Sequence, residues 1–355
     1  MFNSDNLNIW NLTPGVNTLI GSQEIFNIVG SLNCPDKVKE FNYSINKGPE
    51  RPVFFNSLSN GSGRLANPGD FNIDTIQVDQ LESKNEIDFR LLFKDGVEEK
   101  YKIEFPVHFY NNTLPSYKLD LKSIGYSQEA GQIVDGKWHV NKDEQNEKCL
   151  EILKKDAGHD RIILFGRYDW TSNYEITARI CVTSWTHITH NVGLLFKWNP
   201  HLQGDGTNLP VQWSTGLGYF YSLSKGLRIR FGENVHVDSS GKKQGDYVLK
   251  EKPLSFSRYI KGKMLKIANP LLRNGNRSYL FGEDPFSQII PGKHYYFKMH
   301  VHPEEYRLTV WEMGGKEPSP QLVVSKPDEI LKQGSVGIIA YHCGVRIYEY
   351  NVSQI

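Results

Sequence analysis

The chain has 355 residues, of which 41 are Lys or Arg and 40 are Asp or Glu, so its formal net charge at pH 7 is +1. A charge this close to zero provides no field that would attract nucleic acid or an anionic membrane surface. The 39% hydrophobic and 23% charged residues are typical of a folded globular protein and exclude a disordered chain. No stretch approaches the roughly 20 apolar residues of a membrane helix, so we expect no membrane insertion.

The beginning of the chain, Met1–Asn6, has neither the basic residues nor the apolar run of a signal peptide. The compartment stays open, because residence inside the cell, a leaderless export route and a leader already removed all fit this pattern. The 12% aromatic residues and the 31 glycines favour β-structure with many turns. The length exceeds that of one ordinary sandwich and suits two domains, in an oligomeric state that the sequence leaves open.

Residues 1–113 carry strand-sized patterns separated by turn residues. The strand patterns are Gln23–Ser31, Val38–Ile45, Phe71–Val78, Glu86–Lys94 and Tyr101–Val107. This spacing predicts an immunoglobulin- or cadherin-like β-sandwich that ends within Pro106–Ser116, where turn residues break the pattern. We expect this domain to act as a spacer or docking surface without chemistry of its own. The alternative is that the interface between the two domains forms a ligand cleft.

Residues 114–355 continue with longer strands and predict an all-β architecture throughout. The segment Tyr174–Val182 alternates apolar and polar residues, whereas Val192–Trp198 is apolar on both sides. Further strands are expected at Leu217–Leu223, Gly226–Phe231, Tyr295–His302, Arg307–Trp311 and, as a closing pair, Gly334–Val352. Glu147–Lys155 fits a helix or a strand, of which we prefer the strand, and Pro327–Lys332 predicts a short helix.

The order of these segments after Tyr117 resembles a LamG-like jelly roll of the concanavalin A-like lectin and glucanase superfamily. The resemblance rests on Asp135-Gly-Lys-Trp138, on His159–Glu175, on Val192–Trp198, and on Tyr296–Trp311 followed by Gly334–Val352. The whole chain also resembles a bacterial family that pairs an Ig-like domain with this jelly roll. These motifs are turns and strand starts, so they imply an Ig-like domain over 1–113 and a jelly roll over 114–355, and little about function.

The catalytic patterns of that superfamily have only partial counterparts here. Its glucanases carry carboxylates at alternate positions of one strand, and Glu86-Ile-Asp-Phe-Arg90 lacks the last carboxylate and lies in the other domain. Tyr296–His300 resembles a strand of jelly-roll polysaccharide lyases, but the accompanying Arg-rich strand and Gln-x-His motif are not evident. His300 and His302 share one strand face, where they would serve as a base or a metal ligand if they are not simply exposed. Whether the chain is an enzyme therefore stays uncertain.

Cofactor signals are equally sparse. The four cysteines, Cys34, Cys149, Cys181 and Cys343, have no CxxC spacing and fit small apolar core residues, with a Cys181–Cys343 disulfide as the alternative. His187 and His190 have the spacing of a helical zinc pair without a helix, so we expect no metal there. Gly204–Asn208 offers oxygens to calcium, but too few carboxylates converge on it. No cofactor is expected, with calcium at Gly204–Asn208 as the alternative.

The remaining signal is a set of aromatic and histidine residues on predicted strands of the jelly roll. Aromatic faces stack on sugar rings, while polar side chains bond to the hydroxyl groups. We therefore expect an oligosaccharide or polysaccharide partner, held on a face of the jelly roll that comprises Trp198, His201, Trp213, Tyr221 and His342. The alternatives are a polysaccharide lyase or glycoside hydrolase with a non-standard active site, and a structural or protein-interaction module. Trp138 and Trp170 are expected in the core.

Overall fold

The computed structural model describes residues 1–21, 25–56, 65, 67–158, 161–186, 191–198, 289–320 and 333–355, together with the backbone of the strands between 201 and 325. The described part is built from strands, with one short α-helix, α1 (Ser127–Ala130). Three short 3-10 helices accompany it: η1 (Pro35–Lys37), η2 (Val78–Gln80) and η3 (Lys154–Asp156). No described helix has the length and apolar character needed to cross a membrane. The all-β prediction is confirmed.

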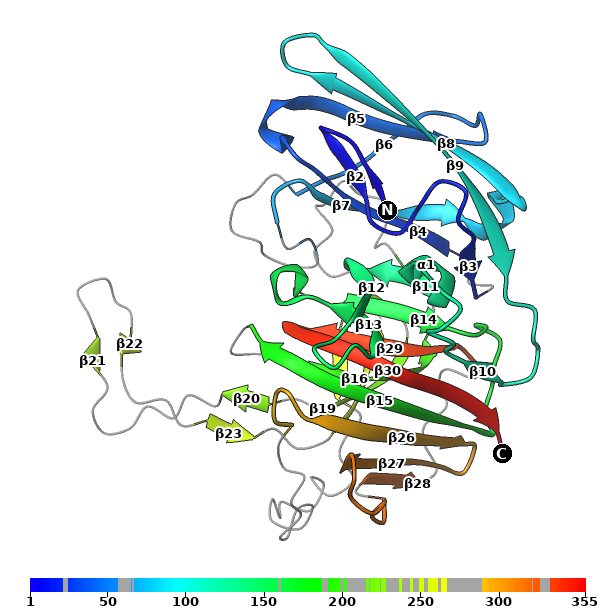
Figure 1. Ribbon diagram of the computed structural model, residues 1–355, viewed down its shortest axis with the longest axis vertical. Coiled ribbons are helices and arrows are strands. Elements are labelled where there is room, and N and C mark those ends of the chain that lie inside the picture. The colour runs from blue at the N-terminus through cyan, green and yellow to red at the C-terminus, as the bar shows by residue number, and fades with distance from the viewer. Residues whose placement is uncertain are drawn as a thin grey trace.

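The first nine strands form two sheets that face each other (Figure 1). The four-stranded sheet has the order β1 (Phe2–Asn3), β2 (Leu7–Ile9), β4 (Ile25–Leu32) and β7 (Asp70–Gln77). The five-stranded sheet has the order β3 (Thr18–Ile20), β9 (Glu98–Phe109), β8 (Lys84–Phe93), β5 (Val38–Ile45) and β6 (Arg51–Pro52), with β3 parallel to β9. Alternate residues of these strands, such as Ile87, Phe89 and Leu91 of β8, meet in one apolar core. We call this unit the N-terminal sandwich.

Two larger antiparallel sheets form the C-terminal sandwich. Its eight-stranded sheet has the order β12 (Trp138–Lys142), β13 (Lys148–Ile152), β30 (Cys343–Gln354), β15 (Tyr174–Trp185), β26 (His294–His302), β27 (Glu305–Glu312) and β28 (Leu322–Ser325), with β10 (Tyr117–Lys118) paired to β30. The seven-stranded sheet has the order β11 (Gln132–Asp135), β14 (Arg161–Phe165), β29 (Ser335–Tyr341), β16 (Asn191–Trp198), β19 (Gly218–Leu223), β24 (Ser255–Ile260) and β25 (Lys263–Lys266).

Three short strand pairs complete the described backbone: β17 (His201–Leu202) with β18 (Thr215–Gly216), β20 (Lys225–Leu227) with β23 (Leu249–Glu251), and β21 (His236–Val237) with β22 (Lys243–Gln244). The segment Glu147–Lys155 contains strand β13, as preferred, followed by η3. Pro327–Lys332 lies outside the described residues. All four cysteines are free, so the Cys181–Cys343 alternative is not realised.

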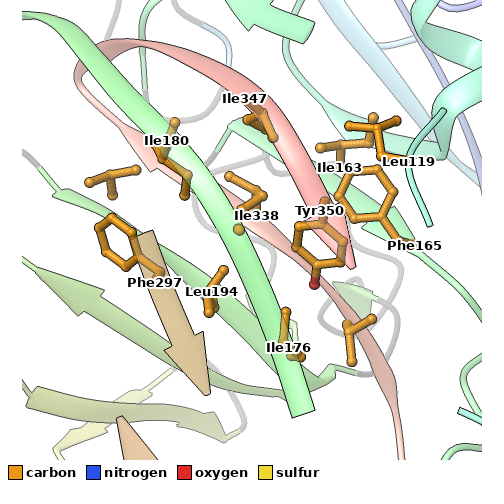
Figure 2. Packing of buried hydrophobic residues seen from close by; sticks show 14 of the residues in the cluster. Leu119, Ile163, Phe165, Ile176, Ile180, Leu194, Phe297, Ile338, Ile347 and Tyr350 are labelled. Atoms are coloured by element: carbon orange, nitrogen blue, oxygen red, sulfur yellow. The ribbon is translucent and has the colours of Figure 1, made fainter. Parts of the chain in front are cut away.

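The last two long strands lie at the centre of the C-terminal sandwich, one in each sheet. β29 pairs with β14 and β16, whereas β30 pairs with β13 and β15. Figure 2 shows Ile338 of β29 and Ile347 of β30 entering the same core as Ile176 and Ile180 of β15. All four side chains are fully buried, and each contributes about 1.5–3 kcal/mol relative to an exposed position. The connection turns at His342, one residue earlier than the expected Cys343-Gly344 turn.

The two sandwiches meet through strands β4 and β7 of the first and β11 of the second (Figure 1). Asn27 donates a side-chain hydrogen bond of 3.0 Å to Asn72, which in turn donates one of 2.8 Å to the carbonyl of Val134. Gln132 donates a 2.8 Å bond to the carbonyl of Ile25. Because Asn27, Asn72 and Gln132 are all buried, each of these hydrogen bonds replaces one that the group made to water in the unfolded chain. Together they fix the two sandwiches against each other.

Candidate functional site: a cleft between the two sandwiches

The five residues expected on the jelly-roll face differ in their burial and in whether the structure describes their side chains. Trp198 is only 4% exposed and packs in a small apolar cluster with residues such as Leu195 and Ile339, so its indole is not at the expected rim. His342 is half-buried, and its backbone takes the left-handed conformation (φ 51°) at the turn before β30. His201 and Tyr221 lie in strands β17 and β19, but their side chains, like all of Trp213, are outside the described residues. The expected core positions of Trp138 and Trp170 are confirmed.

A polar cleft of about 290 Å³ lies where the two sandwiches meet, and we call it the junction cleft. Its lining residues come from both sandwiches: Trp10, Ser31, Leu32, Asn33, Asn67, Pro68 and Asp70 from the first, and Lys137, Asp156 and Arg161 from the second. Polar atoms dominate this lining. The cleft therefore corresponds to the alternative that a ligand site is formed by the interface itself.

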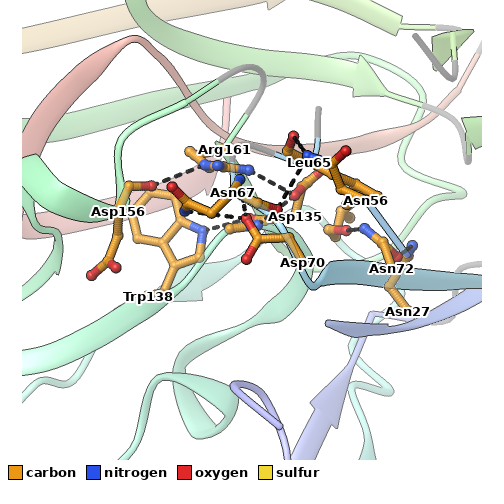
Figure 3. Close-up of polar contacts among 12 residues, drawn as sticks. Asn27, Asn56, Leu65, Asn67, Asp70, Asn72, Asp135, Trp138, Asp156 and Arg161 are labelled. Carbon is orange, nitrogen blue, oxygen red and sulfur yellow. Dashed lines mark hydrogen bonds and ion pairs between the residues drawn. The ribbon is translucent and has the colours of Figure 1, made fainter. Parts of the chain in front are cut away.

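One wall of the cleft is built on an ion pair between Arg161 and Asp135 (Figure 3). Their side chains are 3% and 2% exposed, and Nη1 of Arg161 lies 3.1 Å from Oδ1 of Asp135. The Nε of Arg161 also donates a 3.1 Å hydrogen bond to the carbonyl of Asp156. A buried pair of this kind stays charged only because each partner compensates the other's desolvation.

The turn Asp135-Gly136-Lys137-Trp138 shapes the same wall. Gly136 has a φ of +86°, and a Cβ at this position would lie 2.4 Å from Cδ of Arg161. Both the backbone conformation and the close approach of the aliphatic part of the Arg161 side chain therefore favour glycine at this position. The backbone N–H of Gly136 donates to Oδ1 of Asp135 at 2.7 Å, and Nε1 of Trp138 donates to the carbonyl of Asp135 at 3.0 Å. The turn thus presents Lys137 to the cleft.

Asp70 is the carboxyl group contributed by the N-terminal sandwich. It is the last residue of the turn Asn67–Asp70. Its Oδ2 accepts hydrogen bonds from the backbone N–H and the side-chain amide of Asn67, at 2.9 and 3.3 Å. The residue is 3% exposed, and this burial raises the pKa of Asp70 to about 6, with Arg161 acting in the opposite direction and Asp135 in the same direction. Among the described residues, none donates a hydrogen bond to Oδ1 of Asp70 and no cation forms an ion pair with it.

Trp10 and Lys137 form the rim. Trp10 is half-buried, and its backbone N–H donates to the carbonyl of Val29 at 2.8 Å, which holds it beside the junction. The Lys137 ammonium lies 5.9 Å from the centre of the Trp10 ring, within the range of a cation–π contact. Asp156 also lines the cleft, and its Oδ2 lies 3.0 Å from Nε2 of His139. The cleft thus combines an aromatic face with carboxylates, amides and one ammonium group.

Two other clusters of polar residues are better explained as structure. On the outer face of the eight-stranded sheet, Arg179 pairs with Glu147 and, at 2.8 Å, with Glu349. Every charge of this cluster has a partner, so it offers nothing to a ligand. His300 and His302 are half-buried with parallel rings 6.1 Å apart, and burial lowers the pKa of His300. No group of three or more His, Cys, Asp or Glu side chains in the described part of the chain could hold a metal ion.

Sequence reasoning did not identify Asp70 and Arg161 as site residues, because each lies in a turn or strand start that the strand pattern alone explains. Two signals were present. Asn67-Pro-Gly-Asp70 is a turn that ends on an acidic residue at the start of an apolar strand, and Asp135-Gly-Lys-Trp138 has the pattern of a strand opening. What joins them is the contact between β4 and β11, which spans about a hundred residues of sequence.

No protein-family model and no curated protein matches the chain. Among solved structures, the chain is similar to a protein with a galectin-like fold from Bacillus subtilis (11% identity, TM-score 0.38), over 69% of this chain and 98% of that one. It is also similar to a Lotus tetragonolobus seed lectin (9%, TM-score 0.33), over 68% of this chain and 98% of that one. A xylan β-1,4-xylosidase from Bacillus halodurans (9%, TM-score 0.34) is matched over 98% of this chain and 64% of that one. Similarity at this level says nothing about the ligand of this chain.

Proposed function

We propose that the protein binds carbohydrate and that the junction cleft holds one sugar unit of an oligosaccharide or polysaccharide. The observation that carries the proposal is Oδ1 of Asp70, an acceptor on a side chain that is 3% exposed and lines a polar cleft beside the indole of Trp10. Burying a carboxyl group without a cation is costly, and a ligand hydroxyl or amine donated to Oδ1 would recover part of that cost.

The composition of the cleft supports a sugar over other small ligands. An aromatic ring provides a face for the C–H groups of a pyranose, while Asn67 and Asp70 provide donors and acceptors for its hydroxyl groups. The cleft volume of about 290 Å³ lies at the small end of ligand pockets, which suits a single sugar unit.

This proposal also changes the role expected for residues 1–113. We propose that they form the Ig-like domain and residues 114–355 the jelly roll, as the sequence indicated, and that the first domain supplies half of the site. Deleting it would then remove Trp10 and Asp70 and abolish binding, which a mere spacer would not do. A second ligand surface around Trp213, Tyr221, His201 and His342 of the jelly roll stays a separate proposal.

Catalysis in the same cleft is the second candidate function. Asp70 favours it, because a carboxyl group with a pKa of about 6 is protonated often enough near neutral pH to act as a general acid. The partner across the cleft would be Asp156, whose carboxylate lies 3.0 Å from Nε2 of His139. A glycoside hydrolase acting with such a pair needs only water as co-reactant.

A glycan array probed with the full chain and with the Trp10→Ala and Asp70→Asn variants tests binding and its location together. We expect the wild-type chain to retain a defined set of glycans that both variants lose. Equal binding by all three proteins would place the ligand elsewhere. Incubation with a polysaccharide panel, followed by assays for reducing ends and for the absorbance of unsaturated uronates, then separates a binding protein from a hydrolase or lyase.

A further inference from the structure

The charges of the junction cleft are unevenly matched. Arg161 is committed to Asp135 and to the carbonyl of Asp156, and the carboxylate of Asp156 faces His139. Lys137 lies at the rim over the Trp10 ring. When Asp70 is ionised, the described residues around the cleft provide, apart from the imidazole of His139, the three carboxylates of Asp70, Asp135 and Asp156 and the two cations Lys137 and Arg161, which leaves one carboxylate in excess. That unmatched charge resides on Asp70.

The two carboxylate oxygens of Asp70 differ in their hydrogen-bond partners. Its Oδ2 is occupied by Asn67, whereas Oδ1 accepts no hydrogen bond within the described residues. Arg161, whose charge lowers the pKa of Asp70, forms no ion pair with Asp70 and instead pairs with Asp135. A neutral donor would satisfy the hydrogen-bonding capacity of Oδ1 but leave the charge buried. A cationic donor would satisfy both, with a shorter and stronger charge-assisted bond.

We propose that the sugar recognised in the junction cleft carries a free, protonated amino group, which donates a charge-assisted hydrogen bond to Oδ1 of Asp70. The ligand class is therefore an unacetylated amino sugar or a polymer of it. This inference rests on the proposed carbohydrate binding. An anionic sugar is disfavoured because its charge would be placed beside Asp70 and Asp156, and of the two described cations of the lining, Lys137 and Arg161, the second is already paired with Asp135.

The matched probes are short β-1,4-linked glucosamine oligomers and the same oligomers fully N-acetylated, which differ in the charge and the donor at one position. Isothermal titration calorimetry at pH 7 and constant ionic strength should show the free amine bound at least about tenfold more tightly, since a hydrogen bond to a charged group is the stronger kind. The N-acetylated oligomer binding equally well or better would overturn the inference.

The pH dependence supplies a test that needs no substitution. Groups facing Asp70 are Asn67 of its own turn, Asp135 and Lys137 of the adjoining turn, Arg161 of β14, and Asp156 with His139 behind it. With a pKa of about 6, Asp70 is ionised to about nine-tenths at pH 7 and about one-tenth at pH 5, whereas the sugar amine gains protons over the same interval. The affinity for the protonated amine, corrected for the amine titration measured on the free oligomer, should then fall about tenfold from pH 7 to pH 5. Unchanged or tighter binding at pH 5 would contradict the inference.

Two variants complete the experiment. Asp70→Asn keeps the shape and removes the charge, so it should bind both oligomers with similar affinity at both pH values. Asp88→Asn makes the same charge change on β8, outside the cleft lining, and should retain the preference for the free amine. A preference that survives Asp70→Asn, or disappears equally in Asp88→Asn, refutes the role of Asp70. If neither oligomer binds but a neutral glycan does so in a Trp10-dependent manner, the amino-sugar inference fails and the proposed function stands. If no glycan binds at all, both fail.

Discussion

Asp70 should lower the stability of the protein at neutral pH, and replacing it should reveal by how much. Burial raises the pKa of this carboxyl group from 3.8 to about 6. The folded protein therefore binds more protons than the unfolded chain between these values, and the free energy of unfolding falls as pH rises through this window. The stabilising contribution of the protonated group is complete below pH 3.8 and is lost above about pH 6. At 1.36 kcal/mol per pKa unit the loss is on the order of 3 kcal/mol.

Asp70→Asn cannot titrate, and its side-chain oxygen still accepts the hydrogen bonds that Asn67 donates. We expect the variant to be more stable than the wild type by up to about 3 kcal/mol at pH 7, which corresponds to up to about 4 °C in melting temperature if the chain unfolds as one unit. At pH 4 the difference should nearly vanish. Thermal unfolding followed by circular dichroism at both pH values is the assay. A variant that is less stable at pH 7, or a difference independent of pH, would show that Asp70 has a favourable partner in the folded state.

Three other substitutions are informative. Trp10→Ala should weaken glycan binding by about 1–3 kcal/mol, measured by calorimetry, and lower the melting temperature by only a few degrees, because the half-buried ring packs partly against the core. A larger loss of stability would assign Trp10 mainly to the core. Gly136→Ala should destabilise the protein by about 1–3 kcal/mol, because φ is +86° and the new Cβ would overlap the side chain of Arg161. A variant with the wild-type denaturation midpoint would contradict that geometry. Arg161→Met should cost about 3–5 kcal/mol in urea unfolding at pH 7, because it removes the guanidinium that pairs with the buried carboxylate of Asp135. A smaller cost at low pH is expected, and a pH-independent cost would argue against the ion pair.

Much of the fold followed from the sequence because strand patterns are local. The alternation in Tyr174–Val182 predicted the buried set Ile176, Ala178, Ile180 and Val182, which the structure confirms. The continuous apolar run of Gly334–Ala340 indicated a strand covered on both faces, and β29 is buried along nearly its whole length between β14 and β16. Such patterns predict which residues are buried, but they do not predict the sheet to which a strand belongs.

The candidate site was less accessible to sequence reasoning because it depends on contacts between distant segments. Trp198 was expected at a rim because a turn sequence follows it, yet the residue before it, Lys197, adopts a φ of 51°, and the pairing of β16 with β29 shifts register between Leu195 and Trp198. A shift of this kind changes the face on which the next side chain lies. Asp70 and Arg161 become neighbours only when the two sandwiches pack together, and no local pattern encodes that packing.

Hydrogen–deuterium exchange with and without a glycan selected on the array tests most directly whether the junction cleft is the binding site. We expect slower exchange on ligand addition in the backbone amides around Asn67–Asp70 and Asp135–Lys137, one segment from each sandwich, and loss of that protection in Trp10→Ala. Protection confined to segments around Trp213 and His342 would place the ligand on the jelly-roll face. That result would contradict the assignment of the site to the junction of the two sandwiches.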